Sequence, residues 1–205
     1  MSERNTLARG LHDLGLAAWF GGSLMGAVGV NGAAADVADP SQRARVASAG
    51  WARWTPVNAA AIGAHLLGGY GLVRANRRRV DDQTGVAANT VVKSALTAAA
   101  LAATGYARLL GQRVINAGDV PVAGSTDPLP VTPPAVATAQ KQLTALQWAI
   151  PALTGGIVWS SALHGEQQRP AEQAKGFAKR GGADAKPTGT GVGAILKATV
   201  TGSSR

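Results

Sequence analysis

The stretch LGLAAWFGGSLMGAVGVNGAAA, from Leu14 to Ala35, contains no charged side chain and consists mostly of apolar and small residues. A helix needs about 20 mostly apolar residues to cross the hydrocarbon core of a bilayer. Residues 54–73 and 142–165 have the same character, with one histidine each, and residues 94–107 form a shorter charge-free run. The pattern predicts an all-α fold, in which four helices form a transmembrane bundle.

The polar segments between these runs set the expected limits of the helices. Asp39-Pro40-Ser41 is a turn signal, so residues 36–51 are interpreted as a polar connection that leads into the second helix. The prolines of residues 117–134 exclude a helix or a central strand there, and Pro151 predicts a kink. The expected helices cover about 6–35, the residues after Trp54 as far as the arginines at 74–79, 86–113, and 135–163.

Two parts of the chain differ in composition. Residues 1–165 contain the four apolar runs and form the predicted membrane bundle. Residues 166–205 are rich in Gly, Thr, Ala, Ser and basic residues, and such a segment cannot bury enough apolar surface to order itself. We therefore expect a largely disordered basic tail, with a short surface helix over 172–180 as its one ordered candidate.

The composition favours a membrane protein, although the mean hydropathy is only +0.06. Polar connections dilute that average, and the apolar runs are built from Ala and Gly. Glycine accounts for 27 residues, and inside a soluble helix each would cost about 1 kcal/mol relative to alanine. Within a bilayer, small residues let helix backbones approach closely. The absence of cysteine excludes disulfides and thiolate metal sites.

The distribution of Lys and Arg predicts the topology. The net charge is +9, and the basic residues cluster beside the apolar runs and in the tail, which favours membrane topology over nucleic-acid binding. A cytoplasmic N-terminus places the arginines of 74–79 and the tail in the cytoplasm too. We expect a multi-pass protein of the cell membrane with cytoplasmic N- and C-termini. Trp51 and Trp54 are expected at the outer interface.

Glycines of the first apolar run suggest a helix-packing surface. Gly22, Gly26 and Gly29 recur at three- and four-residue spacing, so they fall on one face of a helix. We expect this glycine face to contact another helix of the same bundle; the alternative is a GxxxG-type contact between two copies. Gly68-Gly69 with Gly71, and Gly155-Gly156, offer thin surfaces on other helices.

Three polar residues at membrane depth are candidate functional groups. His65 stands out, because an ionisable side chain within a span is a functional candidate by default. Asn31 and Asn58 lie near the outer ends of the first two helices, where they either hydrogen-bond between helices or line a small aqueous vestibule. Together with His65 they are the residues that a small-solute pathway would use.

Haem or metal binding would have to involve His12, His65 and His164, which are all the histidines present. Bis-histidine haem requires two imidazoles at similar depth. By residue count, His65 lies on the order of 10 Å deeper than His12 and His164. A pair of His12 with His164 is the arrangement that depth allows, and simple hydrogen bonding of all three is the plainer interpretation. We expect no resident cofactor or metal.

The sequence carries no convincing catalytic signature. No glycine is followed directly by lysine, so the Walker A pattern is not met, and the glycines of residues 188–193 follow no expected strand. Ser160 and Ser161 lie near His164, yet no carboxylate is placed to orient the imidazole. We therefore expect a protein that is not an enzyme.

Two short motifs resemble known families. The segments 146–155 (LQWAIPALTG) and 165–170 (GEQQRP) are similar to those of uncharacterised four-span membrane proteins of high-GC Gram-positive (actinobacterial) type. That likeness implies fold and location but no activity. Leu11-His12 followed by Trp19-Phe20-Gly21-Gly22 resembles the first helix of the copper-resistance D family. The chain departs from a copper role in having no Cys, only Met1 and Met25, and no outward-facing histidine cluster.

These observations predict a non-enzymatic integral membrane protein that packs against itself or a partner. The alternatives are a small-solute transporter-like protein and a haem- or metal-binding membrane protein. The expected partners are the lipid bilayer and either a second copy or another membrane protein, with no nucleic acid.

Overall fold

The computed structural model describes residues 5–75 and 84–167 of the chain. Its helices are α1 (Thr6–Met25), η1 (Gly26–Val30), α2 (Asn31–Ala35), α3 (Pro40–Ala75), α5 (Thr84–Asn116) and α6 (Pro134–Gln167). α1, η1 and α2 follow one another directly, so they form one rod whose limits, Thr6 and Ala35, agree with the predicted first helix. The described residues hold no β-strand, only an isolated bridge between Val122 and Pro128. The all-α prediction is confirmed for this part.

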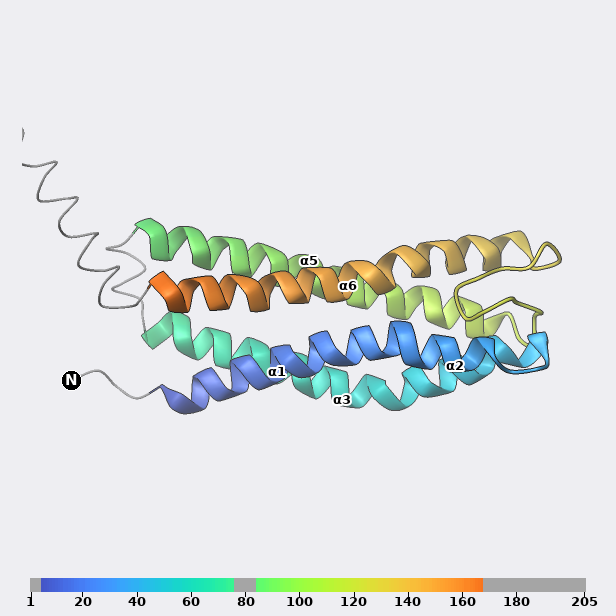
Figure 1. Cartoon of the computed structure of the whole chain (residues 1–205), viewed down its shortest axis with the longest axis horizontal. Helices are drawn as coiled ribbons and strands as arrows, with labels where there is room; N and C mark the ends of the chain where they lie inside the picture. The colour runs from blue at the N-terminus through green and yellow to red at the C-terminus, as the bar shows by residue number, and fades with distance from the viewer. Residues whose placement is uncertain (1–4, 76–83, 168–205) are drawn as a thin grey trace, which may run out of the picture. The chain divides into compact units, whose positions relative to one another are not determined.

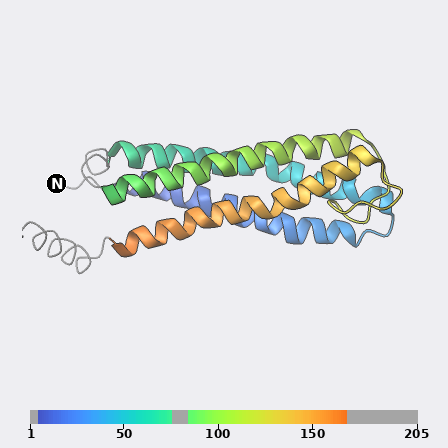
Figure 2. The ribbon, with the colours of Figure 1, turned by 90° about the horizontal axis from the view of Figure 1, so that it is seen from above.

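The described residues as far as Ala162 belong to one compact unit, and a second unit begins at Leu163. The predicted basic tail, with the surface helix expected over 172–180, lies outside the described residues. Within the first unit, successive rods run in alternating directions (Figure 1). α1 packs most closely against α3, and α5 and α6 lie alongside that pair in both perpendicular views (Figure 2).

The start of α3 differs from the sequence prediction. Residues 36–51 were expected to form a polar connection, yet α3 begins at Pro40. Asp39 accepts hydrogen bonds from the backbone N–H of Ser41 at 2.9 Å and from its hydroxyl at 2.7 Å, and these bonds lower the pKa of the Asp39 carboxyl. Asp before Pro is a helix start as well as a turn, because Pro suits the first helical position. The prediction is therefore wrong for residues 40–51.

The remaining limits lie close to the expected ones. α5 extends a few residues beyond the predicted helix at both ends, and α6 begins one residue earlier than expected. α6 continues as a helix through Pro151, and α3 continues through Pro56. In each case a threonine hydroxyl bonds to a carbonyl of the preceding turn: Thr55 to Trp51 at 2.9 Å, and Thr154 to Ile150 at 2.8 Å.

The Pro-rich connection between α5 and α6 closes one end of the helices. As predicted, it forms neither helix nor strand. The Arg43 side chain donates to the Ala123 carbonyl at 2.9 Å, and the Gln140 amide donates to the carbonyls of Gly124 and Ser125, both at 3.1 Å. These bonds tie the connection to the beginnings of α3 and α6.

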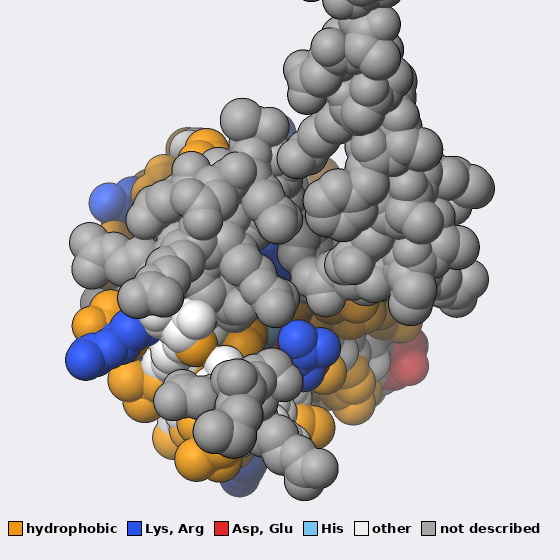
Figure 3. Space-filling model, turned by 90° about the vertical axis from the view of Figure 1, so that its left-hand side faces the viewer, with side chains coloured by type: hydrophobic (Ala, Val, Ile, Leu, Met, Phe, Trp, Pro, Cys, Tyr) orange, Lys and Arg blue, Asp and Glu red, His pale blue; other side chains and the backbone are white. Residues whose placement is uncertain are grey.

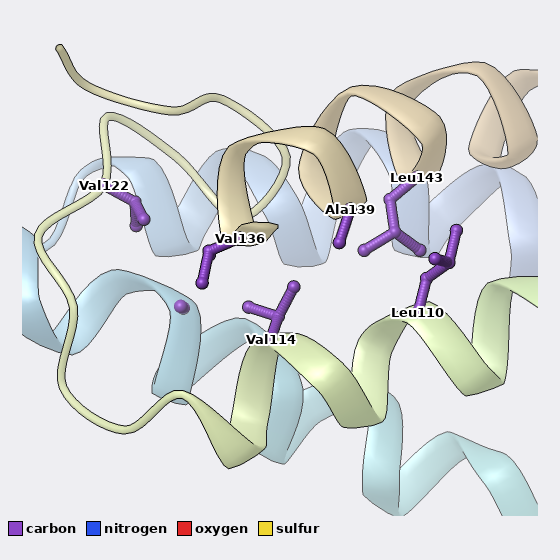
Figure 4. Packing of buried hydrophobic residues seen from close by; sticks show 7 residues of the cluster. Leu110, Val114, Val122, Val136, Ala139 and Leu143 are labelled. Carbon is purple, nitrogen blue, oxygen red and sulfur yellow. The ribbon is translucent and has the colours of Figure 1, made fainter. Parts of the chain in front are cut away.

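Two apolar clusters hold the rods together. Near the Pro-rich connection, Leu110 and Val114 of α5 face Val136, Ala139 and Leu143 of α6, and Val122 of the connection completes the cluster (Figure 4). Ala44 joins it from α3. Further along the bundle, Trp19 of α1 packs with Ala100 of α5 and Ile150 of α6. Trp19 is wholly buried, so all four rods contribute to the core.

One helix in the described part of the chain, Thr6–Ala35, is long and apolar enough by length and composition to cross a membrane. Only 28% of its most apolar window is buried, whereas the core helix of a soluble protein is mostly buried. A single helix of this kind near the N-terminus does not establish four spans.

Candidate functional site: buried polar groups between the helices

Glycine brings the backbones of α1 and α3 into direct contact at two places. A Cβ at Gly15 would lie 2.6 Å from the backbone nitrogen of His65 and closer still to the Ala61 carbonyl oxygen. A Cβ at Gly68 would meet the Ala8 carbonyl and the His12 backbone nitrogen. Real Cβ atoms do not approach other atoms so closely, so these positions require glycine for the close approach.

The predicted glycine face is split between two environments. A Cβ at Gly22 would fall on the indole of Trp54, and one at Gly26 would fall on the indole of Trp51. At Gly29 the nearest atoms belong to Met25 on the same rod, at 3.1 Å. Gly26 and Gly29 both lie in the π-helical segment η1. Because a π-helical turn is wider than an α-turn, regular three- and four-residue spacing no longer places Gly29 on the same face.

The glycine pairs on the other rods also lie at helix contacts. A Cβ at Gly155 would lie 3.2 Å from the Phe20 ring of α1, and one at Gly156 would lie 3.7 Å from the Leu96 side chain of α5. Adjacent residues of α6 therefore face two different neighbours. On α3, a Cβ at Gly71 would lie 3.1 Å from the Ala8 side chain.

His65 is buried against α1, with 3% of its surface exposed. Its Nδ1 lies 3.1 Å from the His12 carbonyl oxygen, and its Nε2 lies 3.5 Å from the Thr97 hydroxyl. A carbonyl only accepts, so the proton is on Nδ1, and Nε2 is left to accept from Thr97. The Trp19 ring lies edge-on, with centroids 6.2 Å apart. The side chain thus connects α3 to α1 and α5.

The imidazoles of His12 and His65 are neighbours, with ring centroids 4.3 Å apart. The expected depth difference of about 10 Å is wrong. The register of α1 against α3, with Gly15 beside His65 and Gly68 beside His12, places the two histidines at the same level. The rings are in contact and the backbones beside them touch at Gly15 and Gly68, so no haem iron fits between them.

Charged groups surround this histidine pair on the His12 side. His12 Nδ1 lies 2.9 Å from an Asp13 carboxylate oxygen. Lys93 of α5 is half-buried nearby; burial lowers its pKa, whereas the negative charge of Asp13 acts to raise it. Among the described residues, no group of three His, Cys, Asp or Glu side chains is arranged to hold a metal ion.

Asn31 joins three rods at the other end of the bundle. Its amide nitrogen donates to the Gln147 side chain of α6 at 2.5 Å, and its oxygen accepts from the Trp51 indole of α3 at 3.0 Å. Both ends of the amide are therefore used in helix packing. The sequence allowed two roles for Asn31, a hydrogen bond between helices or the lining of a small aqueous vestibule. The structure shows the hydrogen bond between helices.

Asn58 has a different environment. It lines an elongated cavity of about 260 Å³ between α3 and α5, whose floor comes from α1 and α6. Its Oδ1 is buried and has no hydrogen-bond partner, and the same holds for the Trp54 indole nitrogen one turn earlier. Neither His65 nor Asn31 lines this cavity. The structure therefore does not bring the three predicted polar residues into one site.

The serines suggested by the sequence bond to their own helix. Ser160 donates to the Gly156 carbonyl at 2.8 Å, and Ser161 donates to the Ile157 carbonyl at 2.9 Å. The side chain of His164 lies outside the described residues, so the predicted pairing of His12 with His164 is not tested. The glycine-rich run at 188–193 is also outside them.

Sequence reasoning missed the inward-facing tryptophans. Trp51 and Trp54 were expected at the outer membrane interface, and that depth stays a prediction; their rings cover Gly26 and Gly22 on the neighbouring rod. The tryptophans are three residues apart, whereas Gly22 and Gly26 are four apart and lie on an antiparallel rod. The spacings therefore gave no signal that pairs these tryptophans with these glycines.

Comparisons with known proteins give no relatives: no family model matches the chain, and neither a curated protein nor a solved structure is significantly similar. The resemblances to actinobacterial four-span proteins and to the copper-resistance D family stay predictions.

Proposed function

We propose that this chain is a multi-pass α-helical protein of the cell membrane that acts by binding rather than by catalysis. The observation that carries the proposal is the distribution of polarity across the rods. Many large apolar side chains face outward, and several polar side chains are buried beside the apolar core, whereas the polar residues of a soluble protein are mostly exposed. The proposed spans are the four charge-free runs, 14–35, 54–73, 94–107 and 142–165.

Each rod contributes exposed large apolar side chains. Leu14 is 74% exposed on α1, Leu67 is 69% exposed on α3, and Trp159 is 69% exposed on α6. On α5, Tyr106 is 42% exposed within the proposed span, and Val91 and Leu109 are exposed just outside it. Seen from the end where α1 begins, hydrophobic side chains lie around the rim with basic ones between them (Figure 3). Lipid tails would cover such a surface, and exposed apolar patches mark membrane or protein contacts.

The buried polar groups support the same proposal. Gln140 and Thr154 are wholly buried, and His65, Asn31 and Ser23 are at least nine-tenths buried. Polar side chains in membrane proteins face the bundle interior and bond between helices. The hydrogen bonds from Trp19 to Thr104 at 3.2 Å, and from Tyr106 to Gln142 at 2.9 Å, join different rods in this way.

Rod length agrees with a membrane span and its flanks. The rods contain 30, 36, 33 and 34 residues, or about 45–54 Å at 1.5 Å per residue. A hydrocarbon core of about 30 Å therefore leaves one or more turns outside. Arg43 and Arg45 at the start of α3 fall in such a flank, beside the Pro-rich connection.

Membrane integration can be tested by alkaline carbonate extraction of membranes from expressing cells. We expect the protein to stay in the pellet, and its release into the supernatant would refute the four-span proposal. Because the chain lacks cysteine, single cysteines report topology cleanly. Asp119→Cys should react with a membrane-impermeant maleimide in intact cells, and Ala75→Cys only after permeabilisation. The reverse pattern would overturn the cytoplasmic termini.

A further inference from the structure

We infer that the cavity between α3 and α5 binds a medium-chain fatty acid, with the carboxylate at Arg108 and the apolar chain inside, beside Ile62 and Ile150. Arg108 is the one charged side chain among the described residues that line this cavity. It is exposed, so it lies at the mouth of the cavity, and no carboxylate of the described residues forms an ion pair with it. Its charge is therefore available to an anion.

The Gln112 side chain holds the guanidinium of Arg108 without neutralising it. In the orientation that satisfies both groups, the Gln112 amide oxygen accepts from both terminal nitrogens, from Nη2 at 2.8 Å. A guanidinium has five N–H donors in a planar fork, so donors remain for a ligand. Arginine binds carboxylates through parallel, charge-assisted N–H···O bonds, and a carboxylate is the ligand group that this geometry favours.

Two neighbouring side chains in the lining supply further donors. The Thr104 hydroxyl accepts from the Trp19 indole at 3.2 Å, so its own proton is left to donate. The Gln147 amide oxygen accepts from Asn31, and its amide N–H groups have no acceptor among the described residues. With Arg108 they make three donors in one cavity lining. An ionised carboxylate only accepts, so it matches this set, whereas an amine does not.

The three donors lie at neighbouring levels of the bundle. Thr104 and Arg108 are four residues apart on α5, a spacing that puts Cβ atoms about 5–6 Å apart on one helix face. α5 and α6 are antiparallel, and Ala100 packs with Ile150, so Gln147 falls one turn further along, level with Thr104. A single head group can therefore reach all three.

Other polar atoms near the cavity take no part in this site. The Trp54 indole nitrogen, the Asn58 Oδ1 and the Ser125 hydroxyl have no hydrogen-bond partner, but they also have almost no accessible surface. A ligand in the cavity does not reach them. The head group is therefore assigned to the donors of Arg108, Thr104 and Gln147 alone.

The inner part of the cavity suits a short apolar chain. Ile62 of α3, Ile150 of α6 and the wholly buried Trp19 of α1 line it. Along α3 this part extends from Thr55 to Ile62, about 10 Å at 1.5 Å per residue. The cavity volume of about 260 Å³ is below the roughly 300–1,000 Å³ of pockets for drug-sized ligands, so an acid of ~8 carbons fits and a phospholipid does not.

Small residues at the mouth leave an entrance from the side. Ala59 of α3 and Gly105 of α5 both line the cavity and are exposed. Arg108 directly follows the charge-free run 94–107, so it lies at the edge of the proposed span, where the carboxylate of a fatty acid in a bilayer also lies. That the acid comes from the bilayer rests on the proposed function, whereas the donors and the cavity do not.

The test is photolabelling of the purified full-length protein, in non-ionic detergent at neutral pH, with a diazirine-bearing octanoic acid. Mass spectrometry locates the labelled peptides, and we expect them in the α3 and α5 segments that line the cavity. Unlabelled octanoate should compete with the probe, whereas 1-octanol and octylammonium at the same concentration should compete far less. Equal competition by 1-octanol, or labelling only elsewhere, would overturn the carboxylate site.

Arg108→Gln tests the role of the charge. It should weaken competition by octanoate at least about tenfold, the order of effect of losing a hydrogen bond between charged groups, while melting of the ligand-free protein stays close to wild type because Arg108 is exposed. Arg113→Gln is the matched control, since it removes the same charge from an exposed position of α5 outside the cavity lining. An equal effect of the two substitutions would refute the site.

Gly105→Phe tests the cavity independently of charge. No atom lies within 4 Å of a Cβ added at Gly105, so the ring is accommodated and obstructs the mouth, and cavity labelling should be lost. Gly21→Phe is its control, because a Cβ added at Gly21 also has no neighbour within 4 Å and Gly21 is not part of the lining. Unchanged labelling in Gly105→Phe would refute the site.

Carbonate extraction separates this site from the proposed function. Release of the protein from membranes with octanoate-sensitive labelling intact would refute the membrane proposal, and with it the bilayer as the source of the acid, but not the carboxylate site. Retention in the membrane pellet without any preference for octanoate over 1-octanol would refute the carboxylate site alone.

Discussion

Gly15→Ala should destabilise the protein, whereas Gly21→Ala on the same helix should not. The added Cβ at Gly15 would lie 2.6 Å from the His65 backbone nitrogen, against the 3.4 Å at which ordinary contact begins. The obstructing atoms are backbone, so no side chain can move aside. α1 and α3 must separate by at least about 0.8 Å, because the Ala61 carbonyl oxygen lies closer still, and a gap of 0.5–1 Å forfeits a quarter to a half of the dispersion energy of the contacting atoms.

The comparison isolates this steric effect. Both substitutions gain the same helix propensity, about 1 kcal/mol, and a Cβ at Gly21 meets nothing within 4 Å. Overpacking costs about 1–3 kcal/mol, which corresponds to a gap between the two melting temperatures of roughly 2–12 °C for a chain of this size. The assay is thermal unfolding of the detergent-solubilised monomer. Identical melting of the two variants would mean that the backbones of α1 and α3 are not in contact.

Three further outcomes are expected. Gly26→Leu should lower the melting temperature, because the new side chain displaces the Trp51 indole and breaks its hydrogen bond to Asn31. Cross-linking between copies should not change. Loss of cross-linked dimers would instead indicate that this face contacts a second copy. Gln140→Leu should free the Pro-rich connection, measured as faster proteolysis near Ser125, since the buried amide bonds two of its carbonyls; unchanged cleavage would contradict this. Asp39→Ala should melt slightly lower than wild type above pH 3.8, the ordinary pKa of this carboxyl. Because folding lowers that pKa, the stabilisation is lost as the pH falls through the lowered value, so the two proteins should converge in acid; a constant difference would show that the carboxylate charge is not involved.

The sequence predicted helix number and approximate limits because long charge-free runs bounded by charge are a strong one-dimensional signal. It failed at the start of α3, where Asp39-Pro40-Ser41 is compatible with both a turn and a helix cap. Only the helical hydrogen bonding of the residues that follow decides between them. The polar character of residues 41–49 suggested a connection, although a helix outside the apolar run can be polar.

The candidate site was less accessible to sequence reasoning because it depends on register between rods. The depths of His12 and His65 were counted from the ends of the apolar runs. That count placed His12 too far out relative to His65, because the first helix begins before its apolar run does. The position of Asn58 was anticipated, but the buried Oδ1 without a partner was not. The cavity arises where α3 and α5 face each other, and no pattern along the chain records it.

The Pro-rich connection has a mechanical consequence. Arg43 bonds it to α3, Gln140 and Thr144 bond it to α6, and it continues directly from α5. A piston-like displacement of one of these rods along its axis would break several of these bonds together, whereas a small splaying of the opposite ends would leave them intact. The fastened end therefore resists axial displacement of these rods more than it resists splaying of their opposite ends.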